Sequence, residues 1–141
     1  VHYLLNTNNV EVYMKNVIYG VFALVFAAFV TPAMAGEASG QFTVISGKEK
    51  YTTAGGVTIK KQGGKSYVVL SDDFKFPGAP DPQLGFGNNG SYDKSSTFTK
   101  LTKLAGSQTF ELPASVDPSK YNEFYVWCVK YSVPLSVAKL K

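Results

Sequence analysis

Polar and apolar side chains alternate over much of residues 36–141, which is the period of a β-strand with one buried face. Residues 41–46 and 56–61 show this alternation, and a β-branched and aromatic run follows at residues 66–70. Gln62-Gly63-Gly64 separates the last two runs, and its glycines supply the positive φ that a tight turn needs. The pattern therefore predicts a β-hairpin at this point.

The second half of the domain predicts further strands and no helix. Residues 97–104 and 107–112 flank a short Ala-Gly turn and predict a second hairpin. The longest strand is predicted over residues 122–133 and the last over residues 135–140, with Pro134 ending or bending the ladder between them. About seven or eight short strands indicate an all-β fold, either an antiparallel β-sandwich or a closed barrel.

The first 35 residues have a different character. Residues 1–13 precede a candidate initiator methionine and are interpreted as an upstream extension outside the fold. A lysine, the apolar run at residues 17–30 and small residues near position 35 predict a cleavable signal peptide over residues 14–35. A membrane anchor is the weaker alternative, because this run is shorter than the roughly 20 residues of a spanning helix. We therefore expect a single periplasmic or secreted domain, residues 36–141, with no stable membrane span after cleavage.

Composition removes several classes of function. The basic residues are all lysine and the net charge is +4. Without arginine the chain lacks the bidentate donor typical of base and phosphate recognition, so no nucleic-acid partner is expected. Residues 36–141 also contain no histidine or methionine. This excludes imidazole-activated nucleophiles, His-rich zinc sites and His or Met ligation of haem iron.

Cys128 is the single cysteine of the chain and the remaining candidate for redox chemistry. It has no internal disulfide partner, so it is free, capped, bound to a group, or linked to another chain, for example in a Cys128-linked dimer. Strand alternation predicts two faces, one with Tyr125, Trp127, Val129 and Tyr131, the other with Phe124, Val126, Cys128 and Lys130. Lys130 would favour the thiolate and the apolar neighbours would disfavour it, so an inert buried residue and a reactive thiol both stay open.

Three aspartates offer a different chemistry. Asp72, Asp73 and Asp81 are interpreted as turn residues that cap backbone N–H groups. As alternatives they could bind a hard cation or act as glycosidase acids. The loops around Asp81 and Asn88-Asn89-Gly90 also suggest a non-catalytic module that binds a protein or a glycan.

The order of several short motifs resembles the DM13 domain over essentially the whole of residues 36–141. These motifs are Gly40-Gln41-Phe42, Thr53-Ala54-Gly55, Leu70-Ser71-Asp72-Asp73-Phe74, Ala79-Pro80-Asp81-Pro82, Leu104-Ala105-Gly106, Leu112-Pro113, Tyr121 and Val126-Trp127-Cys128. The resemblance implies an electron-transfer domain in which a cysteine is the redox centre, either as a bare thiol or holding a prosthetic group such as haem.

By this resemblance Cys128 takes the redox role, with Trp127, Tyr125 and Tyr131 as aromatic walls and a redox protein of the cell envelope as partner. Members of the family often carry a histidine before the Thr-x-Gly turn. This chain has Tyr51 there. Tyr51 is therefore expected to contribute at most a weak oxygen ligand to a bound cofactor.

Overall fold

The computed structural model describes residues 37–141, which lie within one compact unit, Ala35–Lys141. The predictions of an upstream extension and a signal peptide fall almost entirely on residues 1–36 and so lie outside the described residues. Between residues 37 and 141 no helix is long and apolar enough to cross a membrane.

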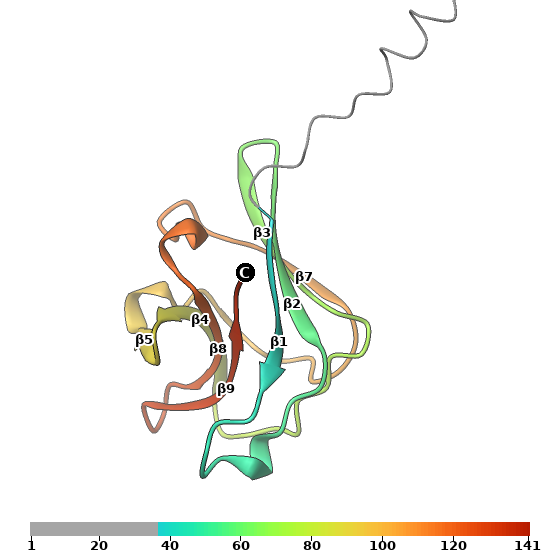
Figure 1. The fold of residues 1–141 in the computed structure, drawn as a ribbon, viewed down its shortest axis with the longest axis vertical. Helices are drawn as coiled ribbons and strands as arrows, with labels where there is room; N and C mark the ends of the chain where they lie inside the picture. Colours follow the sequence, from blue (N-terminus) through green and yellow to red (C-terminus); the bar gives the residue numbers. More distant parts are fainter. Residues whose placement is uncertain (1–36) are drawn as a thin grey trace, which may run out of the picture. The chain divides into compact units, whose positions relative to one another are not determined.

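The described residues form nine strands and three single-turn 3₁₀ helices (Figure 1). In chain order they are β1 (Ala38–Thr43), η1 (Glu49–Tyr51), β2 (Gly56–Gln62), β3 (Lys65–Leu70), β4 (Pro82–Asn88), β5 (Ser91–Asp93), η2 (Lys94–Ser96), β6 (Thr99–Lys100), β7 (Gln108–Glu111), η3 (Pro118–Lys120), β8 (Glu123–Cys128) and β9 (Val133–Lys139). Every strand pair is antiparallel, which confirms the predicted all-β antiparallel fold.

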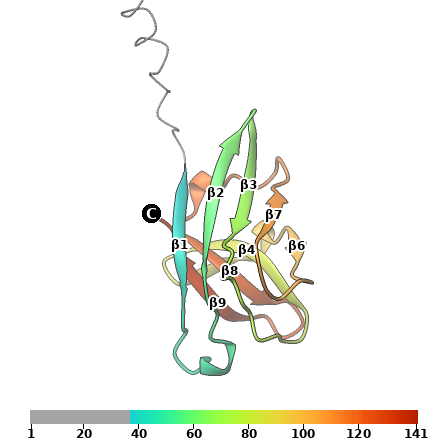
Figure 2. The same cartoon turned by 90° about the vertical axis from the view of Figure 1, so that its right-hand side faces the viewer.

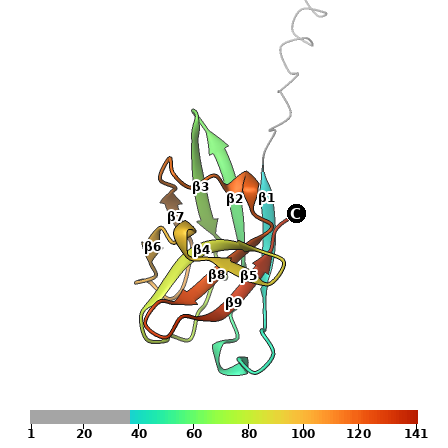
Figure 3. The same cartoon turned by 90° about the vertical axis from the view of Figure 1, so that its left-hand side faces the viewer.

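One sheet contains all the strands, in the order β5-β4-β8-β9-β1-β2-β3-β7, with β6 also paired to β4. β1 joins its two halves, because Ala38–Gln41 pair with β2 whereas Phe42 and Thr43 pair with β9. Figure 2 shows the β1-β2-β3-β7 half and Figure 3 the β4-β5-β8-β9 half. The sheet thus curls into a half-barrel, open between β5 and β7, in place of the predicted two-sheet sandwich or closed barrel.

The core fills the space that the curled sheet encloses. Its aromatic centre comes from three strands: Phe124 of β8 meets Phe86 of β4 edge-on at 5.3 Å between ring centroids and Phe42 of β1 at 6.1 Å. All six residues of β8 are buried, so this strand is covered on both faces. Full burial of one Val or Phe side chain, such as Val126 or Phe124 of this strand, stabilises a fold by about 1.5–3 kcal/mol. β8 is therefore a major contributor to stability.

The first predicted hairpin is confirmed and the second is wrong. β2 and β3 pair from Val57–Leu70 to Gln62–Lys65 around the two-glycine turn. β6 and β7, which lie within the second predicted hairpin, pair instead with β4 and β3. The connection between them crosses from one half of the sheet to the other and is fixed there by an isolated bridge between Lys75 and Ala105.

Pro134 does not end the ladder, but the pairing is irregular beside it, in agreement with the predicted bend. β8 ends earlier than expected, at Cys128, and β9 begins at Val133, so Pro134 lies inside a strand. The pairing register shifts between Val126 and Trp127, just where Pro134 stands opposite Trp127. Such a bulge tolerates a residue that has no N–H to donate.

The Ser136→Ala variant should be more stable than the wild type. Ser136 of β9 is 1% exposed and its Oγ has no hydrogen-bond partner among the described residues. Removing an unsatisfied buried hydroxyl should raise the free energy of unfolding by about 1 kcal/mol, measured by urea denaturation. Ser96→Ala is the matched control, because the equally buried Ser96 Oγ bonds Phe86 and Asp93 and its loss should destabilise the fold. Equal losses in both variants would contradict the prediction.

Candidate functional site

β8 places its side chains on two faces, as the alternation predicted. Phe124, Val126 and Cys128 join the core. Tyr125 and Trp127 are buried on the other face of the sheet, 3% and 9% exposed. The predicted faces do not continue past Cys128, because the strand ends there and the chain turns through residues 129–132.

Cys128 is buried in the position of a small hydrophobic residue, with 1% of its surface exposed. Its Sγ donates a hydrogen bond to the carbonyl oxygen of Pro80 at 3.1 Å. Lys130 does not provide the predicted charge on the same strand face: it is exposed in the turn, with its Nζ 5.4 Å from the ring centroid of Tyr131. The thiol therefore lies against the backbone of the Pro80 segment.

We call residues 77–82, the segment that carries Pro80, the strap. Gly78 and Asp81 have φ values of 98° and 48° within it. Positive φ is unusual for a residue with a Cβ, and Asp81 is held by Gln83 Nε2, which donates to its Oδ1 at 3.1 Å. Pro80 itself is exposed, so the partner of the thiol belongs to a surface segment.

The outer face of β8 carries three aromatic rings in contact, which we call the outer aromatic cluster: Tyr92, Tyr125 and Trp127. Trp127 lies parallel to Tyr92 at 4.1 Å between ring centroids, and Tyr125 meets Tyr92 edge-on at 5.4 Å. Two glycines of β4 make the space, because a Cβ at Gly85 would strike the Tyr92 hydroxyl and one at Gly87 would strike the backbone of β5 and the ring of Tyr125.

Buried polar groups fix this cluster. Glu123 accepts hydrogen bonds at Oε1 from the Gly90 N–H at 2.6 Å and from the Tyr125 hydroxyl at 3.2 Å. Burial, with the Glu123 charge and hydrogen bond adding to it, raises the pKa of Tyr125 to about 12. Burial also raises the pKa of Tyr92, whose hydroxyl lies 2.6 Å from Thr97 Oγ1. Both phenols are therefore neutral at physiological pH.

Comparison with known proteins identifies the family of this chain. The family described as electron transfer DM13 matches residues 29–140, nearly the whole chain. The chain belongs to the DM13 family. No curated protein and no solved structure matches it.

Tyr51 lies apart from the other predicted site residues of this DM13 domain. It is half-buried at the end of η1, where its ring stacks on Phe76 at 6.4 Å and lies 4.9 Å from Lys50 Nζ. Among residues 37–141 no hydrogen bond or ring contact joins Tyr51 to Cys128 or Trp127. The structure thus brings Cys128 and the strap together. It does not place Tyr51 beside them, where a cofactor ligand was expected.

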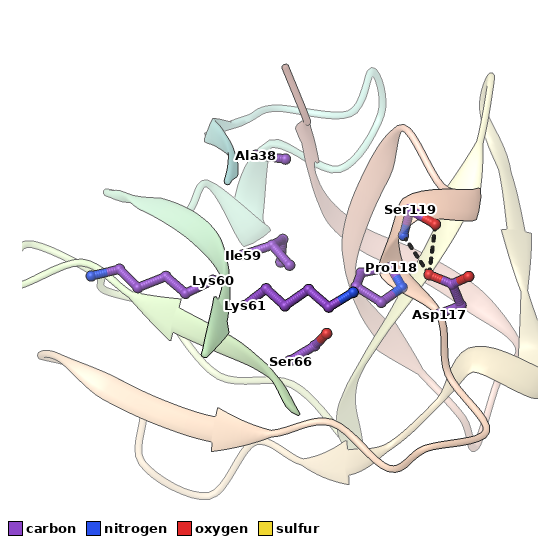
Figure 4. A pocket seen from close by; sticks show the side chains of 8 residues that line it. All are labelled: Ala38, Ile59, Lys60, Lys61, Ser66, Asp117, Pro118 and Ser119. Atoms are coloured by element: carbon purple, nitrogen blue, oxygen red, sulfur yellow. Dashed lines mark hydrogen bonds between the residues drawn. The ribbon is translucent and has the colours of Figure 1, made fainter. Parts of the chain in front are cut away.

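The surroundings of Cys128 do not fit a haem. The Cys128 side chain is buried, its Sγ donates to the Pro80 carbonyl oxygen, and none of four surface pockets of about 320–410 Å³ is lined by Cys128. Figure 4 shows one of these pockets, where Lys61 of β2 extends toward Pro118 and Asp117 accepts hydrogen bonds from Ser119. It shares no lining residue with the strap or β8 of the DM13 fold.

The aspartates are not assembled into a cation site. Asp73 accepts a hydrogen bond from the side-chain hydroxyl of Ser71 at 2.6 Å, where a backbone N–H donor was the prediction. Within residues 37–141 no group of three or more His, Cys, Asp or Glu side chains could hold a metal. The two loops of the predicted binding module are also separate, because Asp81 precedes β4 and residues 88–90 follow from its far end.

The Gly85→Ala variant should lose stability because its methyl group collides with Tyr92. Overpacking of this kind costs about 1–3 kcal/mol. Fluorescence of Trp127, the single tryptophan, should change as the stacked ring is displaced, and urea unfolding gives the energy. Tyr92→Phe in the same chain removes the nearest clashing atom and should recover part of the loss. Tyr92→Phe alone, which keeps Gly85, is the control for the loss of the hydroxyl and of its contact with Thr97.

Stability should fall at alkaline pH because of Tyr125. An unfolded tyrosine ionises near pH 10, whereas folded Tyr125 holds its proton to about pH 12. The contribution of this raised pKa is complete below pH 10 and is lost as pH rises through about 12. The free energy of unfolding should therefore decline over this window, and less steeply in Tyr125→Phe. Equal slopes in the two proteins would show that Tyr125 is not the group responsible.

Proposed function

We propose that this DM13 domain is an exported electron-transfer domain whose redox group is the bare thiol of Cys128. The family description supports electron transfer. The observation that carries the assignment is the hydrogen bond from Cys128 Sγ to Pro80, because it places the only thiol of the chain beneath an exposed loop. Motion of the strap would uncover the sulfur without opening the core.

A lone thiol transfers electrons by thiol–disulfide exchange with a partner. Cys128 loses its proton to water, and the thiolate attacks one sulfur of a partner disulfide. The partner S–S bond breaks, a bond forms between Cys128 Sγ and the attacked sulfur, and the other partner sulfur leaves as a thiolate. The Cys128 sulfur is oxidised and the leaving sulfur is reduced. A second thiol, supplied by another chain, then resolves the mixed disulfide.

The compartment and the partners follow from this chemistry. The signal-peptide pattern of residues 14–35 supports export to the periplasm or beyond, where disulfides persist. A redox protein of the cell envelope is then the natural donor of the disulfide. A Cys128-linked dimer is a second product of the same chemistry: the Cys128 thiolate of one copy attacks the Cys128 sulfur of another copy that is already in the mixed disulfide, and the partner sulfur leaves as a thiolate.

Thiol labelling tests whether the strap controls Cys128. We expect Ellman's reagent to label the native thiol much more slowly than a cysteine peptide, and Pro80→Gly to label several-fold faster than its lowered free energy of unfolding alone allows. Glycine widens the conformations of the strap. Pro113→Gly, at an exposed proline outside the strap, is the matched control and should not accelerate labelling.

Global unfolding is the competing route to the thiol. If every variant labels at the rate that its unfolding equilibrium allows, with no separate effect of Pro80→Gly, Cys128 is a packing residue and the assignment fails. Intact mass should also show a mixed disulfide after exposure to oxidised glutathione, and none in Cys128→Ser.

A further inference from the structure

The turn that follows Cys128 exposes apolar side chains. Val129 is 41% and Tyr131 60% exposed, and they are two of the four large exposed hydrophobic residues within residues 37–141. A single exposed hydrophobic residue needs no explanation. These two belong to one four-residue turn, and Val129 also lines a pocket beside that turn.

The pocket has a volume of about 320 Å³ and is formed by three separate segments. Its lining residues are Gln83, Lys94, Thr97, Trp127, Val129 and Ser132. The stack with Tyr92 fixes the indole of Trp127 before any partner arrives. The recess thus combines a fixed indole and Val129 with polar neighbours, which suits a single side chain of a partner whose apolar part packs on the indole.

Among the residues that line this recess the charged one is Lys94, and Lys130 lies in the adjoining turn. Lys94 Nζ lies 3.5 Å from Ser132 Oγ and Lys130 Nζ lies over Tyr131, and neither ammonium is in an ion pair within the described part of the chain. Two carboxylates lie nearby and are held by hydrogen bonds from neutral groups, which do not cancel their negative charge. Asp93 accepts from the Tyr121 hydroxyl at 2.6 Å, and Asp81 from Gln83.

We propose that Trp127, Val129 and Tyr131, with Lys94 and Lys130 around them, form a docking surface for an acidic protein that inserts one apolar side chain beside Trp127. We call these five residues the turn surface. An apolar centre with a charged rim suits a small, transient interface, where the charges accelerate encounter more than they add affinity.

This inference rests on the proposed function and gives it a geometry. The Val129 N–H donates to the carbonyl oxygen of Asp81 in the strap at 3.3 Å. A protein bound at the turn surface therefore lies against the segment that covers the thiol. Docking and access to Cys128 are then coupled through one backbone contact.

An NMR titration of the full chain tests the surface. The probe is an acidic thioredoxin in its oxidised form, and Cys128→Ser in the labelled chain prevents covalent capture. We expect shifts at the Trp127 indole N–H, Val129 and Lys94 that weaken with added salt. The Lys94→Glu/Lys130→Glu variant should bind at least about tenfold more weakly.

Lys60→Glu/Lys61→Glu is the matched control, since it makes the same change in net charge on β2. Its binding should stay close to that of the parent chain. Equal weakening in the two variants, shifts centred on β2, or no shift at the turn surface would each overturn the proposal. Labelling of Cys128 in Lys94→Glu/Lys130→Glu separates the two ideas, because the thiol test does not depend on docking.

Discussion

The stack of Trp127 on Tyr92 closes the outer face of β8, and the arrangement of the rest of the half-barrel depends on that contact. An antiparallel sheet commonly leaves one face to solvent. Here β4 carries Gly85 and Gly87 directly beside β8, so the ring of Tyr92 lies flat over the strand. With both faces covered, β8 keeps Cys128 in the core and Trp127 in a fixed orientation one residue away.

Features that depend on neighbouring residues in the chain could be predicted from the sequence, whereas features that depend on distant residues could not. The β2–β3 hairpin depends on contiguous residues and a two-glycine turn, and the faces of β8 follow from strand alternation, so both were predictable. β4 was not predicted, because Gly85 and Gly87 inside a strand have the appearance of turn signals. Their purpose becomes visible only when Tyr92 lies against them.

The predictions that failed concern partners distant in the sequence. The segments of the second predicted hairpin have a suitable turn between them, but each pairs with a strand on its own side of the half-barrel. The environment of Cys128 is likewise set by Pro80, 48 residues earlier. A sequence pattern locates the thiol on a strand, but its cover depends on where a proline-rich loop crosses the end of that strand.

Covering the thiol resolves an apparent conflict between burial and redox chemistry. A lone thiol that is permanently exposed in an oxidising compartment reacts with any oxidant or with another copy of itself. A thiol deep in a core reacts with nothing. Cys128 lies between these limits, because its backbone partner is in an exposed loop whose neighbouring residue contacts the turn after β8. Under the proposed function, selectivity comes from the partner that displaces the strap, and no second thiol within the chain is required to protect Cys128.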